Sequence, residues 1–182
     1  MTIENPKHLT TRDMYDSEQD AIRAVTLAAY EEYAAVMAPP IWAGYRQMIL
    51  TTLDEKGAVE RIIAELDGAI VGSVLLYPPN GNTYPGMVDS IDWPEVRLLA
   101  VMPAMRGRGI GVALMEECKR RARHSGATVL GLHTTDMMQT AMRMYERMGF
   151  VRAPAYDLRP GRNMLVKAYH LSLADADGTN ED

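Results

Sequence analysis

A short hexapeptide, RGRGIG, stands between an apolar segment and a helical pattern and contains two residue types that suit an anion: Arg106, Gly107, Arg108, Gly109 and Gly111. The first amides of a helix lack partners within it, and the helix dipole adds partial positive charge at that end. Glycines let a ligand approach those amides because they carry no Cβ atom. Arginines add charged donors for phosphate oxygens. The hexapeptide therefore predicts a pyrophosphate site.

The spacing of these glycines differs from that of the two commonest phosphate motifs. The dinucleotide motif needs a third glycine where Val112 stands, and a P-loop needs Gly-Lys-Ser/Thr, which the sequence lacks. A nucleotide-binding protein of another fold is therefore disfavoured. The glycines alone leave open a structural alternative, in which they only let a helix pack closely on a strand.

The residues around the hexapeptide predict a strand, a turn and a helix. The apolar segment VRLLAV, residues 96–101, has the composition of a buried strand, and Gly126 marks the end of the helix. The helix shows one apolar stripe: Ile110, Leu114, Cys118 and Ala122. The next segment, TVLGLHT, predicts a second strand, which is parallel to the first because a helix connects them.

Other elements are predicted on both sides of this unit. Ser17 is the expected N-cap of a helix whose apolar stripe extends to Val36, and a second helix begins at Pro40. Four residues recur on one side of this helix: Ile41, Tyr45, Met48 and Thr52. Asp67 and Gly68 join two strands as an antiparallel hairpin, so the sheet is mixed. The long loop over residues 78–94 is interpreted either as the border of a site or as a surface excursion.

The composition excludes several classes of partner. The chain has 182 residues, 47% of them apolar, and a formal net charge of -5, so we expect neither nucleic acid nor membrane as a partner. The basic run KRRAR, residues 119–123, is interpreted as cations that favour a helix C-terminus.

A single cysteine and the lack of metal-ligand spacing favour a cytoplasmic protein without a metal. We expect one domain over residues 1–173 and an acidic flexible tail over residues 174–182.

Two segments, taken together, resemble one protein family. EVRLLAVMPAMRGRGIGVALM resembles motif A of the GCN5-related N-acetyltransferase (GNAT) superfamily, and AMRMYERMGF resembles the later helix-to-strand signature of the same family. The matching positions are Arg106, Gly109 and Gly111 in the first segment and Ala141, Tyr145, Gly149 and Phe150 in the second. The resemblance covers roughly residues 95–151 and implies a GNAT-like α/β fold. That fold has a central mixed β-sheet flanked by about four helices, with a splayed parallel strand pair at the acetyl-CoA site.

The resemblance also implies acetyl-CoA as the donor. In this family the pyrophosphate lies on the amides of the hexapeptide, and the pantetheine arm pairs with the preceding strand, here Leu99, Ala100 and Val101. An amide near the first two of these residues would face the developing oxyanion. The family often has an asparagine where Met138 stands, so one contact to the pantetheine arm is expected to be missing.

Two side chains are candidates for proton transfer. A carboxylate near pKa 4.3 that takes a proton from an ammonium near 10.4 faces a cost of about 8 kcal/mol, so a catalytic carboxylate needs burial, a water relay or an acceptor of lowered pKa. Glu95 begins the acetyl-CoA strand, where many similar enzymes have their base, although a surface acid is the alternative. His133 is the substitute, with a structural histidine as its alternative. Tyr145 matches the family's general acid, which assists the departing thiolate, and a core tyrosine is its alternative.

The acceptor is an amine whose identity the sequence leaves open. The family builds its acceptor site from the first two helices, which here supply four acidic or aromatic residues: Glu31, Glu32, Tyr33 and Trp42. The two glutamates are more typical of a solvated helix face, and Tyr33 lies on an apolar stripe, so these residues do not define a pocket. The predicted function is transfer of acetyl from acetyl-CoA directly to a primary amine of a small molecule or peptide. The alternative is a noncatalytic acyl-CoA-binding or sensing module on the same fold. An edge strand near the C-terminus could pair two copies into a homodimer, as happens in this family.

Overall fold

The computed structural model describes residues 8–81, 83–88, 90–161 and 164–174, and these form a mixed sheet. The strands are β1 (Leu9–Asp13), β2 (Glu60–Leu66), β3 (Ala69–Tyr77), β4 (Glu95–Val101), β5 (Val129–Thr134), β6 (Val151–Arg152), β7 (Leu158–Gly161) and β8 (Met164–Ser172). Their order in the sheet is β1-β2-β3-β4-β5-β8-β6, and β7 pairs with β8 beside this path. Only β4 and β5 are parallel neighbours in the described sheet, as the crossover helix predicts.

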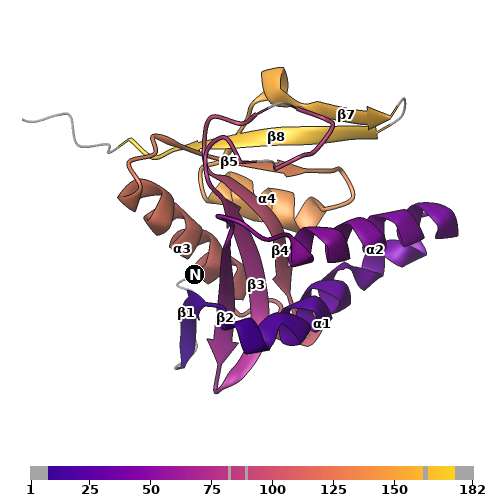
Figure 1. Cartoon of the computed structure of the whole chain (residues 1–182), viewed down its shortest axis with the longest axis vertical. Coiled ribbons are helices and arrows are strands. Elements are labelled where there is room, and N and C mark those ends of the chain that lie inside the picture. The colour runs from indigo at the N-terminus through magenta and orange to yellow at the C-terminus, as the bar shows by residue number, and fades with distance from the viewer. Residues whose placement is uncertain (1–7, 82, 89, 162–163, 175–182) are drawn as a thin grey trace, which may run out of the picture.

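Helices cover both faces of this sheet (Figure 1). The α-helices are α1 (Gln19–Tyr30), α2 (Pro39–Asp54), α3 (Ile110–His124) and α4 (Gln139–Arg147), and short 3-10 turns cover Asp16–Glu18, Glu31–Ala35, Pro103–Met105 and Pro154–Tyr156. One apolar cluster lies between the sheet and α3 and α4, and a second lies between the sheet and α1 and α2. The predicted stripe of α3 is fully buried, and burial raises the pKa of the Cys118 thiol. Cys118 is therefore a small core residue.

The hairpin at Asp67 and Gly68 is confirmed. Both residues have positive φ, 51° and 81°, which a two-residue hairpin turn requires. β2 and β3 pair antiparallel on either side of the turn, from Leu66 opposite Ala69 to Glu60 opposite Leu76.

The first helical segment differs from the sequence prediction at both ends. Ser17 lies inside a 3-10 turn, and Glu18 is the residue that directly precedes α1. The Glu18 carboxylate accepts a hydrogen bond from the Tyr15 amide, 2.8 Å away, so the helical segment starts before the predicted N-cap. α1 ends at Tyr30 and is followed by a 3-10 turn. Val36, which comes directly after this turn, is 69% exposed rather than part of the buried stripe. The second helix begins at Pro39, one residue before the expected start.

The parallel pair splays as the resemblance predicts. In the described residues, β4 pairs with β5 at Glu95 opposite Gly131 and at Val96 opposite Leu132. Leu98 then takes a left-handed conformation, with φ of 49°, and the register between β3 and β4 shifts beside it. This bulge turns β4 away from β5 and frees one edge of its C-terminal half.

Two further expectations concern the C-terminal tail and membrane-spanning helices. The predicted acidic tail over residues 174–182 lies outside the described residues, apart from Ala174. In the part of the chain that is described, no helix has both the length and the apolar character that a membrane crossing needs.

Candidate functional site

The predicted pyrophosphate site lies at the N-terminus of α3. Gly107 and Gly109 have φ of 76° and 78°, a conformation that residues with a Cβ rarely adopt. Gly109 directly precedes the helix and has no side chain with which to cap it, so the amides of the first turn are left for a ligand. Gly111 has another reason to be glycine, since a Cβ there would lie 3.2 Å from the sulfur of Met144. That glycine lets α3 and α4 pack closely.

The two arginines of the hexapeptide lie differently. Arg106 donates hydrogen bonds to the Glu32 carboxylate at 2.7 Å and to the Ala29 carbonyl at 2.9 Å, which holds the turn against the end of α1. Exposed ion pairs of this kind contribute about 1 kcal/mol or less, so a phosphate can compete for the guanidinium. Arg108 is exposed on the same turn.

The free edge of β4 begins directly after the bulge. On the other edge, Ala100 and Val101 lie opposite Ser73 and Gly72 of β3. The Tyr30 hydroxyl donates a hydrogen bond to the Leu99 carbonyl at 3.3 Å and so ties this part of β4 to α1. The free edge of these residues can pair with an extended ligand as an added strand does.

A cavity of about 510 Å³ opens where β4 and β5 diverge. Its walls come from α2, the loop at 78–94, β4, β5, the start of α4 and the hairpin of β7 and β8. The loop therefore borders a site, as one of its two interpretations predicts. The side of α2 that spacing brought together, with Tyr45 and Met48, lines this cavity, while Ile49 and Leu53 enter the core. A hydrophobic stripe toward a ligand site has the same sequence pattern as one toward a core.

Glu95 is fully buried at the point where the two strands separate. Its carboxylate accepts hydrogen bonds from the Tyr84 hydroxyl at 3.1 Å and from the indole nitrogen of Trp93 at 2.9 Å. His133 Nδ1 lies 2.5 Å from the same carboxylate. Glu95 does not itself line the cavity, whereas Tyr84 and His133 do. Any proton exchange between Glu95 and the cavity must therefore pass through these neighbours or a water.

The hydrogen-bond partners of His133 indicate where the protons of its ring lie. Its Nε2 lies 2.9 Å from the carbonyl oxygen of Tyr156, which can only accept, so Nε2 carries a hydrogen. Nδ1 faces Glu95, so one further proton lies between the ring and the carboxylate. The two side chains therefore act as one hydrogen-bonded pair at the wall of the cavity.

Tyr145 lies on α4, is 7% exposed and lines the cavity. Burial raises the pKa of its hydroxyl above the usual value, so the group is a neutral phenol at physiological pH. A neutral phenol can donate a hydrogen bond to an anion that develops beside it. Met138, which stands where the family often has asparagine, lines the same cavity.

The sequence named no acceptor pocket from the first two helices. The four acidic or aromatic residues considered there, Glu31, Glu32, Tyr33 and Trp42, do not line the cavity. Tyr84, Trp93 and Arg97 are near the site and were not singled out from the sequence. The first two lie in the long loop, whose length was the available signal, and Arg97 lies in the strand quoted for motif A.

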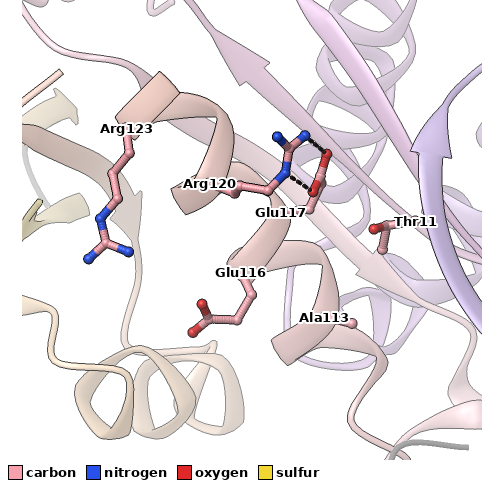
Figure 2. Close-up of a pocket in the computed structure, with 6 residues that line it drawn as sticks. All are labelled: Thr11, Ala113, Glu116, Glu117, Arg120 and Arg123. Carbon is pink, nitrogen blue, oxygen red and sulfur yellow. Dashed lines mark hydrogen bonds and ion pairs between the residues drawn. The ribbon is translucent and has the colours of Figure 1, made fainter. Parts of the chain in front are cut away.

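A second cavity, of about 490 Å³, lies on the outer face of α3 and shares no lining residue with the first. Figure 2 shows its charged side chains, which come from one helix, with the Arg120 guanidinium against the Glu117 carboxylate. Two hydrogen bonds of 2.8 Å join these two groups. Charges that are paired in this way on an exposed helix are typical of a solvated surface.

Neither cavity shows a metal site. In the described ranges, no group of three or more His, Cys, Asp or Glu side chains is arranged to hold a metal ion.

Comparison with known proteins identifies relatives over part of the chain. A model of the Acetyltransferase (GNAT) family matches residues 17–150. The mycothiol acetyltransferase of Nocardia farcinica is 37% identical over 90 residues, which are 50% of this chain and 26% of that protein. The uncharacterized N-acetyltransferase YjgM of Escherichia coli is 28% identical over 88 residues, or 48% of each chain. The matches thus span about a quarter and about half of these relatives.

Solved structures share the architecture at low identity. The PaiA N-acetyltransferase of Thermoplasma acidophilum, in complex with coenzyme A, has a TM-score of 0.67 and 12% identity over 90% of this chain and 98% of that one. A GNAT family acetyltransferase of Brucella melitensis, in complex with acetyl-CoA, has a TM-score of 0.59 and 22% identity over 96% of this chain and 92% of that one. These likenesses confirm the expected fold.

Proposed function

Because the chain belongs to the GNAT family of acetyltransferases, we propose that it transfers the acetyl group of acetyl-CoA to a primary amine of a small molecule or peptide. The observation that carries this proposal is the arrangement at the splayed strands. The uncapped N-terminus of α3, the free edge of β4 and a cavity with Tyr145 in its wall follow one another along one path. The path has the parts that a phosphate, an extended arm and a reacting group need in succession.

The proposed donor site uses the residues of the hexapeptide and of β4. Its members are Arg106, Gly107, Arg108, Gly109 and Gly111 for the pyrophosphate and Leu99, Ala100 and Val101 for the pantetheine arm. The residues fit such a donor, since two glycines with positive φ expose the amides of the turn and the bulge frees the edge of β4. The complexes of PaiA with coenzyme A and of the Brucella protein with acetyl-CoA support the same donor class.

The proposed chemistry has two proton steps. The acceptor amine loses a proton toward Glu95, through His133, Tyr84 or a water, because Glu95 is enclosed by these side chains. The neutral amine then attacks the thioester carbon, the carbon–sulfur bond breaks, and the thiolate of coenzyme A departs, while the nitrogen of the new amide loses its remaining extra proton to that thiolate or to solvent. Tyr145 donates a hydrogen bond to that thiolate as a neutral phenol.

A thiol-release assay with acetyl-CoA and a panel of amines, amino acids and peptides tests the proposal. Tyr145→Phe should lower kcat by on the order of 100-fold and leave the calorimetric Kd for coenzyme A within about twofold, because a hydrogen bond made to the leaving group acts in the transition state. Tyr15→Phe, which removes a hydroxyl from a ring that is 62% exposed, is the control and should change neither. Tight binding of coenzyme A with no release from any acceptor would favour the sensing module instead.

A further inference from the structure

Arg97 places a positive charge in the wall of the main cavity, on β4 two residues before Leu99. Its guanidinium donates hydrogen bonds to the Thr83 carbonyl at 2.5 Å and to the sulfur of Met48 at 3.6 Å. The guanidinium carbon lies 4.6 Å from the ring centre of Tyr84. A carbonyl, a thioether and a ring use only part of the five donors of an arginine.

Arginines elsewhere in the described chain illustrate the contrast. Six of them, at positions 12, 23, 106, 120, 121 and 152, each have a carboxylate within 2.8 Å, whereas exposed arginines such as Arg108 and Arg123, and the half-buried Arg61, have no ion pair in the described residues. The contacts of Arg97 in the described residues include none. Burial raises the pKa of Tyr84 and Tyr77, so both phenols are neutral and supply no counter-charge. A cation in a partly buried site without an anionic partner favours a ligand that brings one.

Among the described residues that line the cavity, Glu55 is the one acid, and its partner is a tyrosine. Its carboxylate accepts a hydrogen bond of 2.6 Å from the Tyr77 hydroxyl. Tyr77 also interacts with Arg97, but no ion pair joins Glu55 to Arg97 in the described residues, so a further carboxylate can approach the guanidinium.

The mouth of the cavity is apolar. Four of its lining side chains are large, apolar and between 38% and 56% exposed: Ile41, Met87, Met137 and Met164. They come from α2, the long loop, the segment before α4 and the start of β8. Exposed apolar side chains gathered around a cavity mark a surface that a ligand covers, and methionines adapt to irregular shapes.

We propose that the acceptor is an amine that also carries a carboxylate and an apolar body, and that Arg97 binds this carboxylate. The inference rests on the proposed acetyl transfer. One guanidinium matches one carboxylate in charge and in its two-pronged shape, whereas a phosphate dianion would need further cations. Arg97 and Leu99 are two residues apart on β4, at most about 7 Å along the chain, so an amine and a carboxylate separated by a few bonds can reach the reacting centre and Arg97 together.

Matched acceptors test the inference in the thiol-release assay. The pairs are phenylalanine with phenethylamine and leucine with 3-methylbutylamine, which differ only in the carboxylate. We expect kcat/KM to favour the carboxylated member by on the order of 10- to 100-fold. Arg97→Gln should abolish the preference through KM, because it lowers kcat/KM for the carboxylated member much more than for the carboxylate-free amine, and calorimetry of coenzyme A checks that the donor site is intact. Arg97→Lys should keep part of the preference that Arg97→Gln loses, because lysine has the positive charge but not the two parallel donors of a guanidinium.

Arg46→Gln is the matched control, because Arg46 is exposed on α2 outside the cavity wall. It should keep the preference. Equal use of both members, or a preference that survives Arg97→Gln, would overturn the inference while acetyl transfer stands. If coenzyme A binds but no amine releases thiol, the transfer proposal fails, and calorimetry with N-acetylphenylalanine and N-acetylphenethylamine then decides. Binding of the carboxylated compound alone would support Arg97 as its site, and equal or absent binding would overturn it.

Discussion

At the scale of single residues, Glu95 has an unusual set of partners for a base. Three donors surround a carboxylate that has no exposed surface: Tyr84, Trp93 and His133. A group held in this way can either receive a proton through a neighbour or only fix the positions of Tyr84 and His133. The two roles differ in how they respond to pH, because an amine that arrives neutral needs no base.

Glu95→Gln separates these roles. We expect kcat/KM to fall by on the order of 100-fold near neutral pH and to recover as the pH approaches the pKa of the acceptor amine. Tyr145→Phe is the comparison, since its loss concerns the leaving thiolate and should persist at high pH. Steady-state rates across pH give the measurement. A Glu95→Gln deficit that stays constant with pH would leave Glu95 with a positioning role only.

At the scale of elements, the junction of β4 and β5 depends on one glycine. Gly131 lies opposite Glu95 in the parallel register. A Cβ at this position would lie 2.0 Å from the indole nitrogen of Trp93 and 2.4 Å from a carboxylate oxygen of Glu95. The missing side chain thus makes room for the hydrogen bond between these two residues.

Gly131→Ala should therefore lower the free energy of unfolding by about 1–3 kcal/mol, as other overpacked interiors do. Gly44→Ala is the matched control. Gly44 lies in α2 with no atom within 4 Å of its added Cβ, so alanine there should raise stability by about 0.5–1 kcal/mol. Urea unfolding of both variants measures the difference. The packing interpretation of Gly131 would be wrong if its alanine variant unfolded at the wild-type midpoint.

Local sequence patterns predicted the helices and strands better than they predicted contacts between residues that are distant in the sequence. The hairpin at Asp67 and Gly68 and the buried stripe of α3 follow from turn chemistry and periodicity, and both are confirmed. Spacing placed four residues of α2 on one side of the helix, but what that side faces depends on where β4 and β5 diverge. The contact between Glu95 and His133 joins residues 38 apart in sequence, and spacing carries no signal for it. The roles of Glu95 and Tyr145, and the extent of one domain over residues 1–173, stay predictions.

At the scale of the whole molecule, a charge network fastens α3 to the edge of the sheet. Arg121 lies 2.5 Å from a carboxylate oxygen of Asp13 in β1, 2.6 Å from Glu60 in β2 and 2.7 Å from Glu117 in its own helix. The hydrogen bond from Arg120 is the largest cause that lowers the pKa of Glu117 to about 2; burial opposes it, and the hydrogen bond and the charge of Arg121 add to the lowering. The folded state therefore holds this carboxylate ionised at a pH where the unfolded chain is protonated.

The stability that Glu117 contributes should consequently depend on pH with a defined sign. Its folded pKa of about 2 lies below the usual 4.5, so the contribution is complete above about pH 4.5 and is lost as the pH falls toward 2. Glu117→Gln should cost about 1 kcal/mol at neutral pH, because the exposed partner Arg120 is screened by solvent, and the cost should shrink in acid. Urea unfolding from neutral pH down to about pH 3 follows this difference. Glu116→Gln, which breaks one exposed ion pair to Lys119, serves as the control and should change the profile much less. A cost of Glu117→Gln that stays the same in acid would mean that packing of the side chain, rather than its charge, stabilises the edge of the sheet.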